Sequence, residues 1–397
     1  MKTISNLLII LGFLFFSSCN SSHDGDKKQS VEVSFDLKNA ESDQFDSVFQ
    51  IKEVFPLFGS EDLPIKRVKR LIKQEKSYWL LAPDLILLTD LEGRVIRTIS
   101  DKGEGPGEFQ SLDDIRWNEF SQLMEVLDRT SGKLISYNLA GDFQKEWKNR
   151  FLYTSLSFFP LGKEYLIYGG AFFDGEGDRL ILVSPESGEK TNGFLPIDNE
   201  RNFLNVLNHD VFFGSQSGVE LFFSDRDTIY SIAAKQVSPF VTFNAGSNKV
   251  PREVYQRSFT NIMEYREELK KQNYITLFTI QPTNKHYYLR FRHQSDFYPA
   301  ILEKSSGKLK LIKAWDSGFG TEFEDLSSYF TLAPIGSEED HIYFSIDPYE
   351  VKSAIEKLKD HPNLSAFLQA NPRIKQIYDR FNEYENPYIL KLSIREF

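Results

Sequence analysis

ILLTDLEGRVIRTI, residues 86–99, consists of an alternating apolar strand, a small polar turn and a second alternating strand. The same pattern returns in four further segments: KLISYNLAGDFQKEW (133–147), RLILVSPESGEK (179–190), TIYSIAAKQVSPFVTF (228–243) and AILEKSSGKLKLI (300–312). The turn glycines Gly93, Gly141 and Gly188 recur about every 47 residues, a period typical of propeller blades. A single blade cannot bury both of its faces, so these units are expected to stack radially and close a ring.

The composition favours an all-β protein with a large core. Of 397 residues, 41% are hydrophobic and 14% are aromatic, and 35 Phe and 18 Tyr stand against 3 Met. Aromatic residues in this excess suit packed sheet faces better than a helical bundle. The formal net charge of −10 is unfavourable for binding a phosphate backbone, so no nucleic-acid partner is expected.

The repeat predicts a six-bladed β-propeller over residues 31–397. The expected blades span about 64–100, 113–148, 154–197, 208–245, 274–313, and 328 to the C-terminus. An N-terminal strand, either VEVSFDL (31–37) or QIKEVFPL (50–57), is expected to complete the last blade and lock the ring. Two helical insertions are predicted, at about 251–273 and 348–381, and Pro362 and Pro372 should break the second into two or three short helices.

The N-terminus has the pattern of an export signal. Residues 1–18 contain Lys2 and an apolar run from Leu7 to Phe16 that is too short to span a bilayer. The sequence FSSC ending at Cys19 resembles the lipobox of bacterial lipoproteins, which implies that Cys19 is acylated and becomes the mature N-terminus. The alternative is an ordinary cleaved signal in which Cys19 is incidental. Residues 19–30 are polar and aperiodic, as expected of a flexible tether.

Cys19 is the single cysteine of the chain. This count excludes an intramolecular disulfide and an all-protein thiolate metal site, and it favours acylation as the role of the thiol.

GEGPGEF (103–109) and its flanks carry a resemblance to a known family. LEGRVIRTI precedes this segment, and LDDIRW and GKLISYNLAGDFQKEW follow it. This order resembles the six-bladed β-propeller lipoproteins of the Bacteroidetes, which are related in architecture to NHL-repeat propellers, and ENPYILKLSI (385–394) resembles the closing strand of that family. The resemblance implies the fold, export and a lipid anchor, but it assigns no catalytic residue.

Three residues are the candidate ligand-binding side chains. Glu108 in the glycine-rich turn is a candidate for facing the central channel, the alternative being that it caps exposed backbone N–H groups. In YYLRFRHQ (287–294), alternation places Arg290 and Arg292 on one face, where they could hold a carboxylate or sulfate. The alternative is that both arginines pair with carboxylates of neighbouring blades.

No catalytic residue, metal site or cofactor is predicted. FFDGEGDR (172–179) starts like a calcium loop, but Arg179 and Pro185 stand where Gly and Glu are required. GSQSG (214–218) has Gln216 at the nucleophile position and a strand–turn–strand context. The histidines of the expected fold are scattered singly: His209, His286, His293, His341 and His361.

The sequence is interpreted as an exported, lipid-anchored propeller that acts as a binding or scaffolding module at the cell envelope, at the outer membrane. The expected partners are the membrane, through the lipid, and a glycan, a peptide or an envelope protein. The alternative is a hydrolase or lyase with its site in the channel. A binding module should have an open pocket lined by aromatics and Arg, whereas an enzyme should have a tight cluster of His and carboxylates.

Overall fold

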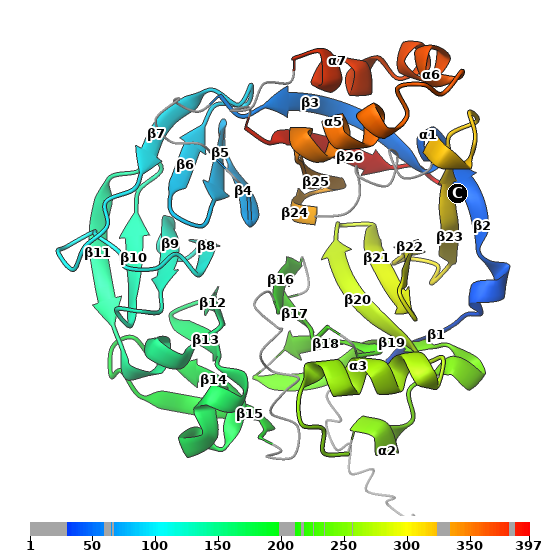
Figure 1. Ribbon diagram of the computed structural model, residues 1–397. Coiled ribbons are helices and arrows are strands. Elements are labelled where there is room, and N and C mark those ends of the chain that lie inside the picture. The colour runs from blue at the N-terminus through cyan, green and yellow to red at the C-terminus, as the bar shows by residue number, and fades with distance from the viewer. Residues whose placement is uncertain are drawn as a thin grey trace, which may run out of the picture.

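The described residues form six β-sheets arranged around a central axis (Figure 1). The computed structural model describes residues 30–58, 65, 67–197, 211–215, 218–224, 226–233, 235–255, 257–323, 334–380 and 386–397. Cys19, the predicted signal segment and the predicted tether up to residue 29 lie outside the described residues, as does His209. Within the described part of the chain, no helix is long and apolar enough to cross a membrane.

The first three sheets are antiparallel and consist of consecutive strands. Their strands are, in order, β4 (Arg70–Gln74), β5 (Ser77–Leu81), β6 (Ile86–Thr89) and β7 (Val95–Ile99); β8 (Asp114–Asn118), β9 (Leu123–Asp128), β10 (Lys133–Tyr137) and β11 (Phe143–Lys148); and β12 (Ser157–Leu161), β13 (Glu164–Tyr168), β14 (Asp178–Val183) and β15 (Lys190–Pro196).

The other three sheets each take up a strand from the N-terminal part of the chain. They contain β16 (Phe212–Ser215), β17 (Gly218–Phe222), β18 (Thr228–Ala233) and β19 (Gln236–Asn244) with β1 (Val31–Ser34); β20 (Ile275–Pro282), β21 (His286–His293), β22 (Asp296–Glu303) and β23 (Leu309–Asp316) with β2 (Glu41–Gln44); and β24 (Pro334–Glu338), β25 (His341–Ile346) and β26 (Tyr388–Ile394) with β3 (Phe49–Pro56). β1 and β2 add to their sheets in parallel, and β3 pairs antiparallel with β26.

The first strands of the sheets form a closed circle. β4 contacts β8, and the contacts continue through β12, β16, β20 and β24, which in turn contacts β4. This radial arrangement is that of a β-propeller. The N-terminal β3 is the outer strand of the sheet that contains the C-terminal β26, with Phe49 opposite Ile394 and Pro56 opposite Tyr388. Of the two segments expected to lock the ring, it is therefore 50–57 that joins the two ends of the chain, while 31–37 lies against β19.

The hydrophobic core lies between neighbouring sheets, so most strands are buried on both faces. In β5, Tyr78 and Leu80 pack toward β25 and β26, whereas Trp79 and Leu81 pack toward the sheet of β8–β11. All four side chains are at most 1% exposed. Because neighbouring sheets cover both faces of such a strand, apolar side chains on either face are buried and stabilise the fold. The strands therefore contain consecutive apolar residues and not alternating apolar and polar ones.

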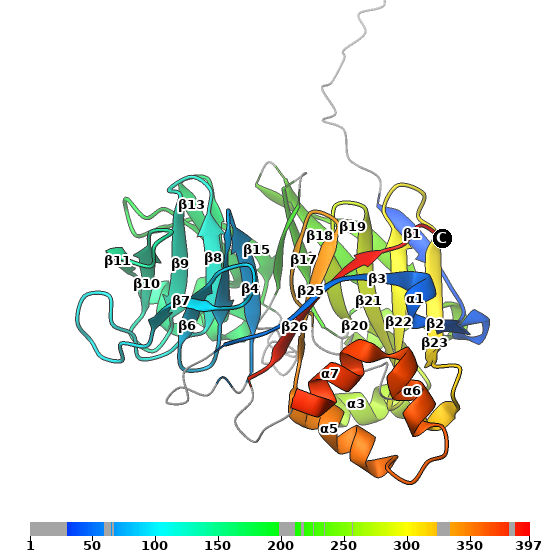
Figure 2. The same cartoon turned by 90° about the horizontal axis from the view of Figure 1, so that it is seen from above.

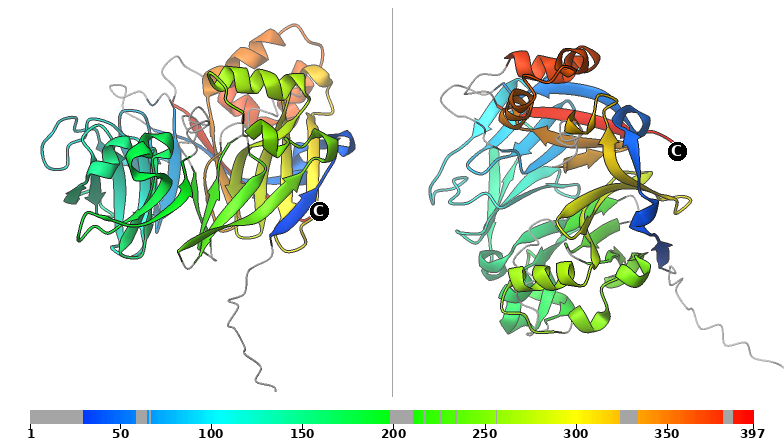
Figure 3. Two further views of the ribbon diagram at one scale, coloured as in Figure 1. Left: turned by 90° about the horizontal axis from the view of Figure 1, so that it is seen from below. Right: turned by 45° about the vertical axis from the view of Figure 1, so that its right-hand side comes forward.

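The two ends of the ring differ in what they carry. The hairpin rim is defined by the described turns that join the first and second strands of five of the sheets, at residues 75–76, 119–122, 162–163, 283–285 and 339–340. The opposite end, the helical rim, carries α2 (Arg252–Tyr255), α3 (Ile262–Lys271), α5 (Pro348–Lys357), α6 (Leu364–Ala370) and α7 (Pro372–Arg380) (Figure 2). The left view of Figure 3 shows α3 and α5–α7 at this same end of the ring.

Local signals in the sequence start and stop these helices. Asn261 caps α3 by accepting hydrogen bonds from the backbone N–H groups of Met263 and Glu264, and Asp347 caps α5, which has Pro348 in its first turn. Three short helices occupy the second helical segment and are separated at Pro362 and Pro372. The described residues also contain α1 (Phe45–Val48) and the 3-10 helices Leu37–Asn39, Arg150–Thr154, Gly170–Glu176, Gly246–Asn248 and Thr321–Phe323.

Candidate functional site

The first strands of the six sheets enclose a cavity of about 820 Å³. Each of β4, β8, β12, β16, β20 and β24 contributes lining residues, so the cavity lies on the axis of the ring. Its lining also includes turn residues such as Glu119, Gly162 and Asn284, which places its mouth at the hairpin rim. Its volume is in the range of small-molecule binding sites, about 300–1,000 Å³.

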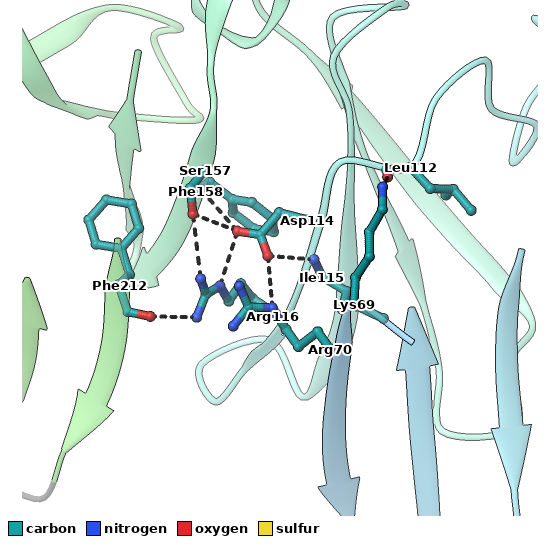
Figure 4. Close-up of polar contacts among 9 residues, drawn as sticks. All are labelled: Lys69, Arg70, Leu112, Asp114, Ile115, Arg116, Ser157, Phe158 and Phe212. Carbon is teal, nitrogen blue, oxygen red and sulfur yellow. Dashed lines mark hydrogen bonds and ion pairs between the residues drawn. The ribbon is translucent and has the colours of Figure 1, made fainter. Parts of the chain in front are cut away.

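Asp114 is the centre of a polar cluster (Figure 4), and the Arg70 and Arg116 side chains of this cluster line the cavity. Its side chain is 1% exposed, and its two carboxylate oxygens receive two guanidinium groups. Arg70 Nε lies 3.0 Å from Oδ1, and Arg116 Nε lies 3.2 Å from Oδ2. Ser157 Oγ donates a further hydrogen bond to Oδ2 at 2.6 Å. Asp114 thereby holds both arginines in the cavity wall.

The Asp114 cluster joins four successive sheets. Arg70 comes from β4, Asp114 and Arg116 from β8, and Ser157 from β12. Arg116 Nη1 also donates to the backbone carbonyl of Phe212 in β16 at 2.9 Å. Such a buried ion-pair network fixes geometry, because removal of one partner leaves an uncompensated charge in a medium of low dielectric constant.

The sequence LDDIRWN explains why these side chains meet. In β8 the buried Ile115 packs between the first two sheets, while Asp114, Arg116 and Asn118 occupy the alternate positions. Because β8 is the innermost strand of its sheet, this polar face meets the first strands of the following sheets, where Asp114 and Arg116 contact Ser157 of β12 and Arg116 contacts Phe212 of β16. A run of polar residues at alternate positions of a first strand is the sequence signal for this site.

Two chemically different walls face each other across the cavity. Trp117, Phe120 and Phe159, from the β8 and β12 strands and the turn after β8, form what we call the aromatic wall. The polar wall, from β20 and β24 and the turn after β20, consists of Gln281, Asn284, Ser337 and Glu338. The order of the sheets around the ring places these walls on opposite sides. Lys73 of β4 forms an ion pair with Glu338 at 2.5 Å.

A buried carboxyl group supports the turn that carries Phe120. Glu125 is fully buried in β9 and accepts hydrogen bonds from Tyr165 Oη at 2.8 Å and Asn118 Nδ2 at 3.0 Å. Asn118 Oδ1 in turn accepts hydrogen bonds from the backbone N–H groups of Phe120 and Ser121. Burial raises the pKa of Glu125, and the hydrogen bonds from Tyr165 and Asn118 oppose that rise.

The three candidate residues from the sequence are absent from the described lining of this cavity. Glu108 Oε2 accepts a hydrogen bond from Gly105 N at 2.9 Å, so its carboxylate closes its own turn. Arg290 and Arg292 lie on β21, the second strand of its sheet, where the Arg290 guanidinium stacks 4.5 Å from the Phe297 ring and that of Arg292 lies 5.5 Å from the Phe278 ring. Their roles in binding a ligand remain predictions.

The other motifs from the sequence have structural surroundings of their own. Glu176 pairs with Arg150 at 2.9 Å, and Asp178 pairs with Lys190 at 2.8 Å, so two carboxylates of the acidic loop are in ion pairs. In GSQSG, Ser215 and Gly218 pair across an antiparallel hairpin, which is a strand–turn–strand context. His286 is buried on β21, and burial lowers its pKa.

Comparison with known proteins gives a family and a fold. The model of the family described as "Domain of unknown function (DUF4934)" matches residues 29–393. Among proteins of curated function, no relative matches the sequence. A Bacteroides fragilis structure, described as a candidate exported protein, superposes with a TM-score of 0.71 at 14% identity, covering 92% of this chain and 100% of that chain. A member of the duf4221 family from Bacteroides vulgatus superposes with a TM-score of 0.50 at 12% identity, covering 88% and 98%.

Proposed function

This chain belongs to the DUF4934 family, whose description names no activity, and we therefore propose a function from the chain's own channel. The protein is a binding module that takes a small ligand into the cavity on its axis. It is a six-bladed propeller, with each of the six sheets as one blade. It is exported and held at the outer membrane by a lipid on Cys19.

The composition of the cavity wall carries this proposal. Arg70 and Arg116 line its inner end, and Trp117, Phe120 and Phe159 line one side, so the cavity combines aromatic surface with a few fixed polar groups. Binding sites for small molecules have this composition, in which apolar surface supplies affinity and fixed polar groups supply orientation. The fold alone does not favour a function, because propellers support unrelated activities.

A variant that obstructs the cavity mouth tests the proposal. Asn284 is exposed at the mouth, and Asn284→Trp would place an indole there. Gln144→Trp, on the exposed outer strand β11, is the matched control. In a thermal-shift screen of sugars, amino acids and short peptides, compounds that stabilise the wild type and Gln144→Trp should fail to stabilise Asn284→Trp. Ligands that stabilise all three proteins equally would place binding outside the channel.

A further inference from the structure

We infer that the ligand of the channel is a short, neutral oligosaccharide, an inference that rests on the proposed binding function of the cavity. Three properties of the wall support this ligand class: its charged groups form ion pairs with one another, one side is aromatic, and the amide side chains of Gln74 in β4 and Asn284 in the turn after β20 line it without a hydrogen bond in the described part of the chain.

The charged groups of the wall disfavour a charged ligand. Asp114 is shared by Arg70 and Arg116, and Lys73 is paired with Glu338. One carboxylate between two guanidinium groups leaves one positive charge at the inner end, and Glu119 at the mouth offsets it, so the wall as a whole has no net charge with which to attract an ion. A ligand without formal charge does not depend on such attraction.

The aromatic wall presents rings from two adjacent sheets. Trp117 and Phe159 are half-buried, and Phe120 is 61% exposed at the mouth. Lys163 Nζ lies 5.8 Å from the centroid of the Phe120 ring. The C–H face of a sugar ring packs on such an aromatic surface, while the hydroxyl groups at its edge stay available for hydrogen bonds. This division of apolar face and polar edge matches the two walls of the cavity.

The amides of Gln74 and Asn284 supply the polar partners. Within the described part of the chain, neither side chain makes a hydrogen bond, and both line the cavity. A carboxamide offers an acceptor oxygen and a donor NH₂ side by side. A sugar hydroxyl is both donor and acceptor, so neighbouring hydroxyls can satisfy one amide completely. The cavity of about 820 Å³ is large enough for more than one sugar ring.

The test uses the full-length chain without its signal segment on an array of neutral glycans, acidic glycans and peptides. The neutral glycan with the strongest signal is then measured by calorimetry. Phe120→Ala should weaken its binding about tenfold, since one stacking contact is lost, and Gln74→Ala should weaken it by a comparable factor. Tyr349→Ala is the matched aromatic control, because Tyr349 is 67% exposed on α5 at the helical rim, and it should leave the affinity unchanged.

The outcomes separate this inference from the proposed function. If acidic glycans or peptides bind, neutral glycans do not, and Asn284→Trp abolishes that binding, the channel is a binding site for another ligand class and the present inference is wrong. If neutral glycans bind but Phe120→Ala, Gln74→Ala and Asn284→Trp all bind normally, both the inference and the proposed function are overturned. An array without any signal that depends on the channel also overturns the inference.

Discussion

Asp114 is the residue on which the geometry of the channel depends most directly. It is 1% exposed and holds the guanidinium groups of Arg70 and Arg116 at 3.0 and 3.2 Å. A buried carboxylate in this position stabilises the fold because two cations from different sheets would otherwise face each other in a medium of low dielectric constant.

Asp114→Asn should therefore lower the free energy of unfolding by about 3 kcal/mol or more, since the variant keeps the shape of the side chain and removes its charge. Asp142→Asn is the matched control, because Asp142 pairs with Arg97 at 2.5 Å but is exposed, where water screens the pair. Urea unfolding of the three proteins measures both effects. Equal losses in the two variants would contradict a special role for Asp114.

Asp128 should make the free energy of unfolding depend on pH in the acidic range. Burial by itself would raise the pKa of Asp128, but hydrogen bonds from the backbone N–H groups of Gln110 and Ser131 and from the Ser111 hydroxyl hold it below its usual value of 3.8. A lowered pKa in the folded state contributes stability above the unfolded value, and this stability is lost as the pH falls through the folded value.

Asp128→Asn should thus be less stable than the wild type at neutral pH, and the difference in unfolding free energy should shrink below about pH 4. The measurement is urea unfolding of both proteins between pH 2.5 and pH 7. A difference that stays constant over the whole range would show that the charge of Asp128 is unimportant.

The arginines that the sequence proposes for ligand binding lie at another level of their sheet than the arginines that line the cavity. Arg290 and Arg292 share one face of a strand, as predicted from alternation, yet β21 is a second strand and their guanidinium groups stack on Phe297 and Phe278. Arg116 lies on a first strand and reaches the axis. Alternation determines which face a side chain is on, but the position of the strand in its sheet determines what that face meets.

Among the elements, the GEGPGEF turn has a local geometry that its sequence predicts. The glycines predicted a close backbone approach, and a Cβ added at Gly103 would clash with Glu108 Oε2. The capping role considered for Glu108 agrees with its hydrogen bond from Gly105 N. The location of the turn relative to the channel was not predictable, because it depends on how whole sheets stack.

A double-mutant cycle should detect this contact between Gly103 and Glu108. Gly103→Ala should destabilise the protein because the new methyl group displaces the Glu108 carboxylate from Gly105 N. In the Glu108→Ala background the methyl group meets no carboxylate, so the same substitution should cost about 1 kcal/mol less. Gly175→Ala is the control, since a Cβ there has no neighbour within 4 Å. Strict additivity of the two substitutions would rule out the contact.

At the scale of the whole molecule, the ring is closed by strands from both ends of the chain. β3 and β26 are neighbours in one sheet, although more than 300 residues separate them in the sequence. The periodic hairpins predicted the ring. The sequence did not distinguish 31–37 from 50–57 as the closing strand, because apolar and polar residues alternate in both segments. Pairing with β26 selects the second, while the first extends another sheet.

Deletion of residues 386–397 should therefore lower the melting temperature strongly, because it removes β26 between β25 and β3 and opens the ring. Deletion of residues 20–30, which precede the first strand, should leave the melting temperature near that of the wild type. Calorimetry of the two truncated proteins makes the comparison. Similar melting temperatures would contradict closure of the ring by β3 and β26.

The direction of β1 links the proposed lipid anchor to the cavity mouth. β1 runs parallel to β19, which begins at the hairpin rim, so the chain enters β1 from the rim where the cavity opens. Residues 20–30 reach at most about 40 Å when fully extended. A lipid on Cys19 should therefore hold the cavity mouth toward the membrane and the helical rim away from it. Because Cys19 is the single cysteine and would be blocked by its lipid, an introduced cysteine is a unique site for a fluorescent label.

Phe120→Cys places that label at the cavity mouth, and Tyr349→Cys places it on α5 at the helical rim. On phosphatidylcholine vesicles that carry a nitroxide at the headgroup, fluorescence at position 120 should be quenched more strongly than at position 349. A further Cys19→Ala substitution, with the label kept at either position, should abolish vesicle binding and quenching, since the tether alone offers no apolar surface. Equal quenching at the two positions, or stronger quenching at position 349, would show that the anchor does not hold the cavity mouth toward the membrane. A ligand would then reach the cavity from the aqueous side.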